Sequence, residues 1–340
     1  MPTNNYFSQE FFAQQPRIFL APMEGLLDFE LRQILCSVST YDAIFTPFVR
    51  ISNNVLPDYV YTKMAPELLM DAKNRPKLIV QLLGSHAKLL AENAFNLSQL
   101  SPDGIDLNFG CPSPTVNRHG GGAELLKNPD LIFEICQQVR RSVPQNISVS
   151  AKIRLGVENT KSALLCSQAV ISANLNFLTI HARTKMEMYQ KIIHYDVIAE
   201  IAEKFADFPI IANGEIWSLE DAKNCQNIAK TPHLMLGRGA VSNPLLICDI
   251  KNLQNFDAEN KNAWQKIVDL LSLYAFKVRK RLNSQQTAGR IKLWLKYLSK
   301  NFYQAADLYQ QIMQIKYFED FPREISKIFE KYFKNLVENI

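Results

Sequence analysis

The stretch at residues 104–114 reads GIDLNFGCPSP, and a triple glycine follows at residues 120–122. Apolar and polar residues alternate up to Asn108, which is typical of a β-strand, and the glycine and prolines beyond it predict a turn at the strand's carboxyl end. Gly110 lets the backbone approach a ligand closely, and Pro112 restricts the direction in which the chain leaves the turn. Most cysteines are small buried hydrophobic residues, but this setting predicts that Cys111 lies at the rim of a sheet.

Strand-like segments alternate with helix-like segments through the first 250 residues. The predicted strands are 17–23, 43–48, 77–83, 104–110, 148–155, 177–184, 209–215 and 233–239, and predicted helices between them include 86–98, 129–141, 161–172, 196–205 and 219–226. This alternation predicts an α/β fold, a TIM (β/α)8 barrel. A doubly wound sheet is the alternative, but its first strand would normally precede a glycine-rich dinucleotide fingerprint, whereas here it ends in APMEG.

Polar and turn-forming residues stand at the carboxyl ends of these predicted strands. They are Pro22, Met23, Gln81, Asn108, Cys111, Lys152, Arg154, His181, Arg183, Asn213, Gly214, Glu215, Gly237 and Arg238. The carboxyl ends of barrel strands meet at one mouth, which is where such barrels carry their chemistry. A single histidine such as His181 is explained equally well by a structural role in the core. The whole set stands at the same end of its strands, however, and this common position predicts a functional site.

Residues 213–214 and 237–238 follow the last two predicted strands, where TIM barrels commonly bind phosphate through backbone N–H groups and a helix start. Lys152 and His181 could add positive charge or donors to the same ligand. The sequence has no P-loop and no cluster of metal-ligating residues. It therefore predicts a phosphate-bearing organic cofactor rather than ATP with magnesium, and no bound metal.

Composition limits the compartment and the number of domains. At 340 residues with a net charge of +5, the chain fits one large domain plus an appendage. The six cysteines form no CxxC pair, which argues against a disulfide framework or a zinc site and suits a reducing, cytoplasmic compartment. No apolar run approaches 18 residues, as a membrane span would require. Residues 1–16 do not resemble a secretory signal, and we expect them to form a poorly ordered extension.

Residues 251–340 are predicted to form a small all-α domain that follows the barrel domain at 17–250. From Lys261 onward there are 15 Lys and Arg against 7 Asp and Glu, whereas the preceding residues hold 23 against 26. Arg290, Trp294 and Tyr297 share a face of one predicted helix. A basic and aromatic face suits a folded RNA, but a solvated lysine-rich face explains these residues equally well.

Together these motifs resemble the tRNA-dihydrouridine synthase family. The resemblance covers 19–300 and is carried, in family order, by APMEG (21–25), QLLG (81–84), NFGCP (108–112), KIRLG (152–156), HART (181–184), IANG (211–214) and GRGA (237–240). Further segments resemble the C-type enzymes, which reduce uridine 16 of the tRNA D-loop: MEG (23–25), FVR (48–50), AENA (91–94), ANGEIW (212–217) and RIKLWLKYL (290–298).

The resemblance implies an FMN cofactor, with NADPH as a transient reductant. The implied cofactor-binding residues are Pro22, Met23, Glu24, Gln81, Lys152, His181, Asn213, Gly214, Glu215, Gly237 and Arg238. In the family, hydride passes from the flavin to one carbon of the uracil double bond, and a cysteine, here Cys111, protonates the other carbon as a general acid. A thiol with an ordinary pKa of about 8.5 is mostly protonated at neutral pH and still gives up its proton readily.

The resemblance also implies the tRNA-binding residues. Asn108 and Arg154 would hold the target base, Tyr189 would adjoin the flipped nucleotide, and Arg50, Arg290, Lys292 and Tyr297 would orient the tRNA. Family members suggest a monomer. Two other functions remain as alternatives: an FMN barrel that oxidises or reduces a free pyrimidine, as in dihydroorotate oxidation, and an RNA-binding barrel without activity.

Overall fold

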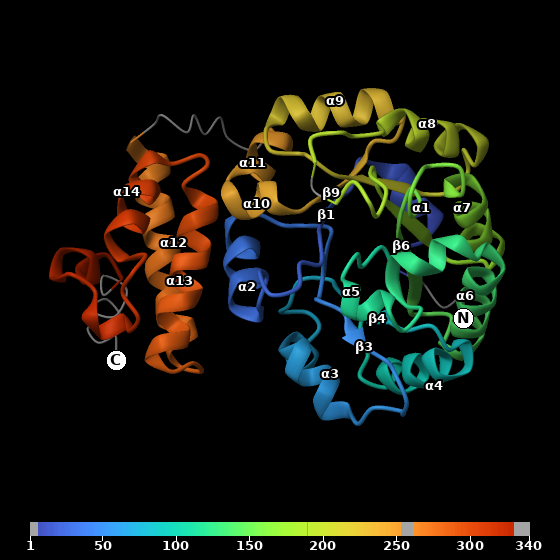
Figure 1. Cartoon of the computed structure of the whole chain (residues 1–340), viewed down its shortest axis with the longest axis horizontal. Helices are drawn as coiled ribbons and strands as arrows, with labels where there is room; N and C mark the ends of the chain where they lie inside the picture. The colour runs from blue at the N-terminus through green and yellow to red at the C-terminus, as the bar shows by residue number, and fades with distance from the viewer. Residues whose placement is uncertain (1–5, 189, 253–260, 330–340) are drawn as a thin grey trace. The chain divides into compact units, whose positions relative to one another are not determined.

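The protein is described by a computed structural model that covers residues 6–188, 190–252 and 261–329 (Figure 1). The chain divides into two compact units. The first contains Met1–Glu24, Tyr41–Ile216 and Glu220–Gly237, and the second contains Gly25–Thr40, Trp217–Leu219 and Arg238–Ile340.

Eight parallel strands of the first unit close into a barrel. They are β1 (Ile18–Leu20), β2 (Ala43–Phe45), β4 (Leu78–Leu83), β5 (Gly104–Phe109), β6 (Ser148–Arg154), β7 (Phe177–His181), β8 (Ile210–Asn213) and β9 (His233–Leu236). The pairing of β2 with β4 closes the ring, and a short strand, β3 (Val49–Arg50), adds to the end of β4. The predicted TIM barrel is confirmed.

Helices surround the barrel strands on the outside (Figure 1). The helical segments of this unit are α1 (Gln9–Gln14), α3 (Asp58–Met64), η1 (Pro66–Leu69), α4 (Ala87–Ser98), α5 (Pro114–Asn117), η2 (Gly122–Lys127), α6 (Pro129–Ser142), α7 (Ala163–Ser172), α8 (Tyr195–Lys204) and most of α9 (Leu219–Ala229). The strands are buried almost throughout, as expected when helices cover one face and barrel side chains the other. Local sequence fixes the helix starts: at α6, Asn128 accepts a hydrogen bond from the Leu131 amide and Pro129 occupies the first turn.

The strand register brings the polar tips together. Asn108 on β5 lies opposite Lys152 on β6, and Arg154 on β6 lies opposite His181 on β7. His181 in turn lies opposite Asn213 on β8. Residues scattered over more than a hundred positions of the sequence therefore form neighbouring rows at the carboxyl ends of the strands.

Residues 6–16 depart from our expectation of a poorly ordered extension over residues 1–16, and residues 1–5 lie outside the described residues. Phe7, Phe11 and Phe12 are buried with Phe19 and Phe177 in one aromatic cluster, which includes the first residue of β7. Arg17 stabilises the segment further, because its Nε donates to the Phe11 carbonyl at 2.8 Å and its Nη1 pairs with Asp42 at 3.2 Å. The polar composition of residues 1–16 hid this packing, since three phenylalanines supply most of the apolar area that is buried.

The second unit is helical. It contains α2 (Phe29–Val38), α10 (Arg238–Ser242), α11 (Leu246–Ile250), α12 (Lys261–Arg279), α13 (Ser284–Leu298), α14 (Tyr303–Ile312) and η3 (Phe318–Asp320). A capping box formed by Asn283 and Gln286 starts α13. Trp294 on α13 is only 1% exposed and packs edge-on against Tyr274 of α12. Among the described residues, no helix combines the length and the apolar character needed to span a membrane.

Candidate active site

Cys111 sits in a turn just past the tip of β5. The side-chain oxygen of Asn108 accepts hydrogen bonds from the amides of Gly110, at 2.9 Å, and Cys111. The Cys111 carbonyl accepts from the Ala123 amide at 2.9 Å and from the Asn117 side chain at 3.0 Å. Both the N–H and the carbonyl of Cys111 are therefore hydrogen-bonded. Such fixation of the backbone is what a site needs if it is to hold one sulfur atom in place.

Gly122 makes this arrangement possible. Its φ is +63°, a conformation that glycine adopts readily, and a Cβ at this position would lie 2.6 Å from the Cys111 carbonyl oxygen. No side chain fits there without moving the turn. The triple glycine noted in the sequence thus has a specific structural cause at its third residue.

The Cys111 thiol is half-buried. Burial raises the pKa of the thiol, and the Glu24 carboxylate raises it further, whereas a backbone hydrogen bond from Ser113 and the charges of Arg154 and Arg50 lower it. The net direction is upward, so the thiol stays protonated at neutral pH. Such a group can donate a proton, and a thiolate nucleophile is not favoured here.

Gln81 and Asn108 belong to a buried polar network. Asn108 donates to the Gln81 side-chain oxygen at 2.7 Å, and Gln81 donates to the Asp106 carboxylate at 2.7 Å. Ser150 donates to the other Asp106 oxygen at 2.6 Å. Burial raises the pKa of Asp106 to about 6 even though these hydrogen bonds oppose the shift. Gln81 is fully buried, so the structure gives it a role in orienting Asn108 beneath the Cys111 turn.

Lys152 donates to the Asn213 side-chain oxygen at 2.9 Å, and the Asn213 amide group donates to the Met235 carbonyl at 2.8 Å. Burial, aided by the charge of Arg154, lowers the pKa of the Lys152 ammonium to about 7, although Asp106 opposes this shift. A cation that is desolvated in this way gains stability when an anionic or strongly accepting ligand approaches it. This donor set fits a phosphorylated, electron-accepting ring cofactor.

Glycines follow β8 and β9 directly, at positions 214 and 237. A Cβ on Gly214, whose φ is +132°, would lie 3.1 Å from the His181 ring, so glycine permits a close approach to that ring. A Cβ on Gly237 would meet only Ala21 and the Met23 sulfur, at 3.8 and 3.9 Å. Gly214 therefore lies close to His181, and Gly237 lies close to Met23. Such close contacts are expected for residues that enclose one ligand.

Arg154, which the resemblance assigns to the target base, is bonded to backbone carbonyls of the protein itself. Its Nε donates to the Gly110 carbonyl at 2.9 Å, and its Nη1 donates to the carbonyls of Thr184 and Met188 at 2.9 and 3.3 Å. It is 3% exposed. The side chain thus ties the Cys111 turn to the loop that follows β7, and its charge acts on the thiol from within the protein.

Glu215 is paired within the barrel. Its carboxylate accepts from the buried Arg183 guanidinium at 2.8 Å, and Arg183 also donates to the Ile192 carbonyl at 2.9 Å. This ion pair fixes the loop after β7 against the residues that follow β8. Of the Asn213–Glu215 segment, Asn213 is bonded to Lys152 and Gly214 lies against His181, whereas Glu215 acts through Arg183.

The remaining predicted cofactor residues lie in loops. Pro22 and Met23 follow β1 and are partly exposed. Glu24 is more exposed as a whole residue, but the partial burial of its carboxyl group raises the pKa of that group. Arg238 starts α10, and its guanidinium lies over the Trp217 ring, 5.2 Å from the ring centre. Tyr189 lies outside the described residues. Within the described ranges, no group of three or more His, Cys, Asp or Glu side chains could hold a metal ion.

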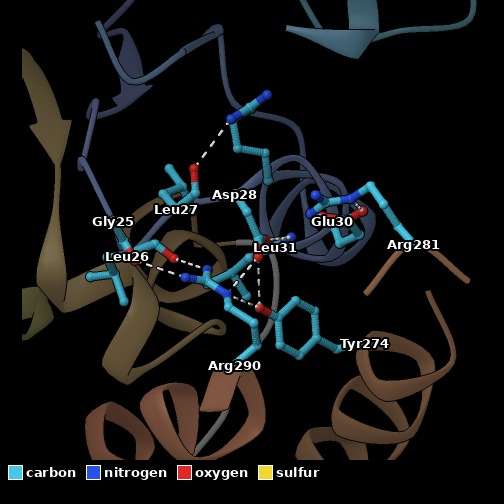
Figure 2. Close-up of polar contacts among 10 residues, drawn as sticks. Gly25, Leu26, Leu27, Asp28, Glu30, Leu31, Tyr274, Arg281 and Arg290 are labelled. Carbon is cyan, nitrogen blue, oxygen red and sulfur yellow. Dashed lines mark hydrogen bonds and ion pairs between the residues drawn. The ribbon is translucent and has the colours of Figure 1, made fainter. Parts of the chain in front are cut away.

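The predicted tRNA-binding residues have different surroundings. Arg50 ends β3 and acts electrostatically on Cys111. Arg290 is turned inward, donating to the carbonyls of Gly25 and Leu26 (Figure 2). Lys292 donates to the Ile315 carbonyl at 2.7 Å, and Tyr297 is partly exposed. Trp294 donates to the Val241 carbonyl at 3.1 Å and is a core residue, which excludes it as an exposed ring for base stacking.

A family model described as dihydrouridine synthase matches residues 19–336. The chain belongs to the dihydrouridine synthase family. A protein of Cupriavidus necator named tRNA-dihydrouridine(16) synthase is 42% identical over 302 residues, covering 88% of this chain and 93% of its own length. A protein of the same name from Ralstonia nicotianae is 42% identical over 306 residues, covering 88% and 92%. The family predicted from the sequence motifs is therefore confirmed.

A comparison of structures supports the fold alone. Histamine dehydrogenase from Rhizobium sp. 4-9 superimposes with a TM-score of 0.50 at 14% identity, covering 69% of this chain and 45% of that chain. At this identity the likeness concerns the barrel, and the dihydrouridine synthase motifs carry the functional argument.

Sequence reasoning missed several residues that build the site. Asp106, Ser150 and Asn117 form hydrogen bonds that support the residues we singled out. Asp106 had a usable signal, since it lies two residues before Asn108 on the same strand and therefore faces the same side. Asn117 had none, because its bond to Cys111 depends on how the chain folds back after the turn.

The depressed pKa of Lys152 predicts a pH dependence of stability. Between pH 7 and 10.5 the folded protein binds fewer protons at this residue than the unfolded chain, so stability rises with pH across that window. The free-energy cost of burying the charged Lys152 ammonium is fully present below pH 7 and disappears above pH 10.5. For protein purified free of ligands, the free energy of unfolding is measured with urea at pH 7 and at pH 9.5. Between these two pH values we expect it to rise by at least about 1 kcal/mol more in wild type than in Lys152→Met.

The matched control is Lys88→Met, which removes an exposed lysine from α4. Its stability relative to wild type should not change with pH over the same range. A pH-independent difference between wild type and Lys152→Met would contradict the assignment of a buried, titrating ammonium.

Proposed function

We propose that this protein reduces uridine to 5,6-dihydrouridine at position 16 of the tRNA D-loop, with FMN as its cofactor and NADPH as the reductant. The family membership and the names of the relatives support the reaction and the target position. The single observation that carries the proposal is the Cys111 thiol, held at a barrel-strand tip by Asn108 and Gly122 in surroundings that keep it protonated.

The residues around the barrel mouth fit an FMN cofactor. Lys152 offers a partly desolvated ammonium, and His181, Gly214 and Gly237 offer close approach beside it. We assign the cofactor to these residues together with Pro22, Met23, Glu24, Gln81, Asn213, Glu215 and Arg238, with Gln81 and Glu215 acting through their partners. When bound, FMN would supply the hydride for the uracil double bond.

Cys111 supplies the proton. Its Sγ donates to the uracil carbon that does not receive the hydride, and the resulting thiolate is stabilised by the nearby Arg154 and Arg50 charges. Asn108 fixes the turn that carries the sulfur, because its side-chain oxygen accepts from the Gly110 and Cys111 amides. A cysteine suits this role because a serine hydroxyl is far too weak an acid.

The target uridine has to leave the base stack to reach the barrel mouth. We assign Arg50, Lys292 and Tyr297, with Tyr189, to the tRNA, and we propose residues 251–340 as the domain that docks the folded RNA through its excess of basic residues. None of the six cysteines, all of which lie within the described ranges, forms a disulfide, and we propose a reducing, cytoplasmic compartment. We propose that the protein acts as a monomer.

One experiment separates this function from its alternatives. Purified protein is supplied with NADPH and with unmodified tRNA, uracil or orotate in parallel, and NADPH oxidation and dihydrouridine are measured. We expect oxidation above background only with tRNA, and dihydrouridine at position 16. Turnover of a free pyrimidine would favour the small-molecule barrel, and tRNA binding without bound flavin or turnover would favour the non-catalytic barrel.

A further inference from the structure

Arg290 closes a ring of polar contacts around the turn at Gly25–Asp28 (Figure 2). Its Nη1 donates to the Gly25 carbonyl at 2.7 Å and its Nη2 donates to the Leu26 carbonyl at 2.5 Å. Its Nε lies 2.7 Å from an Asp28 carboxylate oxygen. All three guanidinium nitrogens are therefore engaged with residues of one turn, namely Gly25, Leu26 and Asp28.

Other side chains complete this arrangement. The Tyr274 hydroxyl accepts from Arg290 Nε at 3.1 Å and donates to the Asp28 carboxylate at 3.0 Å. The second Asp28 oxygen accepts from the Leu31 amide at 2.8 Å, which caps α2. The Leu27 carbonyl accepts from Arg32 at 3.2 Å. Three successive carbonyls of the turn thus receive arginine donors, and the turn has one defined conformation.

The residues immediately before this turn belong to the active site. Gly25, with a φ of +72°, directly follows Glu24, whose carboxylate acts on the Cys111 thiol. Met23 places its sulfur beside Gly237. Because Glu24 is bonded covalently to Gly25, the conformation of the turn determines where the Met23–Glu24 segment can lie.

We propose that Arg290 is a positioning residue for the active site: by holding the carbonyls of Gly25 and Leu26 it fixes the turn that directly follows Met23 and Glu24, and so the conformation of that segment. This role rests on the proposed function in one respect, namely that Cys111 is the catalytic group. It also gives Arg290 a task different from the tRNA contact that the sequence predicted.

The chemistry of the contact requires arginine. A guanidinium presents donors in a fixed planar fork that can reach two carbonyls and a carboxylate together, whereas a lysine ammonium cannot reproduce that geometry. Asp28 supplies the opposite charge, so the partly buried cation is not left uncompensated.

The test uses a readout that needs neither flavin nor tRNA. Iodoacetamide alkylation of Cys111 in the full-length protein is followed against pH by mass spectrometry of its peptide, for wild type, Arg290→Met and Arg290→Lys. Release of the turn moves Glu24 away and exposes the thiol, and both changes lower its pKa. We expect the alkylation midpoint of Arg290→Met to fall by about half a pH unit, and Cys111 to react about threefold faster near neutral pH.

Arg281→Met is the matched control. Arg281 pairs with Glu30 at 2.7 and 2.8 Å, so this variant removes an equivalent ion pair to α2 without touching the turn carbonyls. Its Cys111 profile should match wild type, and Arg290→Lys should lie between wild type and Arg290→Met. Alkylation of Cys36 on α2, which is also partly exposed, reports any general loosening.

Three results would overturn the proposal. Unchanged Cys111 reactivity in Arg290→Met, with only a higher KM for tRNA, would make Arg290 an RNA contact. An equal shift in Arg281→Met, or a parallel rise at Cys36, would reduce the effect to loss of local stability. A positioning role predicts instead a lower kcat at saturating tRNA. If wild type forms no dihydrouridine, the proposed function fails, whereas the alkylation profiles still decide the role of Arg290.

Discussion

Cys111→Ala lowers the rate of dihydrouridine formation by about 10²–10⁴-fold, the range expected for loss of a general acid. The variant still binds FMN and is still reduced by NADPH at the wild-type rate, because the thiol takes part only in protonating the uracil. The physical basis is the upward pKa shift from burial and from Glu24, which keeps the proton on sulfur until the base accepts it. Stopped-flow flavin reduction and single-turnover oxidation by tRNA separate the two half-reactions.

Two further variants sharpen this prediction. Cys111→Ser keeps a small polar side chain but should remain almost as slow as Cys111→Ala, because a hydroxyl is a much weaker acid than a thiol. Cys36→Ala, which removes another partly exposed cysteine, should be fully active. Full turnover by Cys111→Ala would remove this residue from the mechanism.

Gly122→Ala should be a strongly damaging change although it adds only one methyl group. Its Cβ would lie 2.6 Å from the Cys111 carbonyl oxygen and 3.0 Å from a Val116 methyl carbon, and the neighbouring backbone cannot yield cheaply. We expect the free energy of unfolding to fall by about 3 kcal/mol, and dihydrouridine formation to fall by more than about tenfold as the cysteine is displaced.

Gly120→Ala is the matched control in the same loop. Gly120 has a similar φ of +69°, but an added Cβ would meet no atom within 4 Å. This variant should therefore carry only the backbone cost of a left-handed alanine, about 1–2 kcal/mol, with activity retained. Equal activity losses in the two variants would show that backbone strain, and not contact with the Cys111 turn, limits the enzyme.

The roles of the polar residues could be predicted only in part. Sequence placed Asn108, Lys152 and His181 at strand tips. The register confirms that Asn108 lies opposite Lys152, and that His181 lies opposite Arg154 on the same strand as Lys152. It did not predict that Asn108 would be occupied by the amides of the Cys111 turn, or that Arg154 would bond a carbonyl 44 residues away. Periodicity specifies the face on which a side chain lies, but not the partner that a long polar group reaches.

The sequence by itself determined the barrel, the order of its strands and the strand ends at which its polar residues gather, because strand alternation and turn residues act over short distances along the chain. Tertiary structure alone decided the burial of Phe7 and Phe12, the core position of Trp294 and the contact of Arg290 with Gly25, 265 residues away. These outcomes depend on which surfaces meet after folding. An aromatic ring or a guanidinium can serve a core, a turn or an RNA equally well, and only its surroundings in the folded chain select among them.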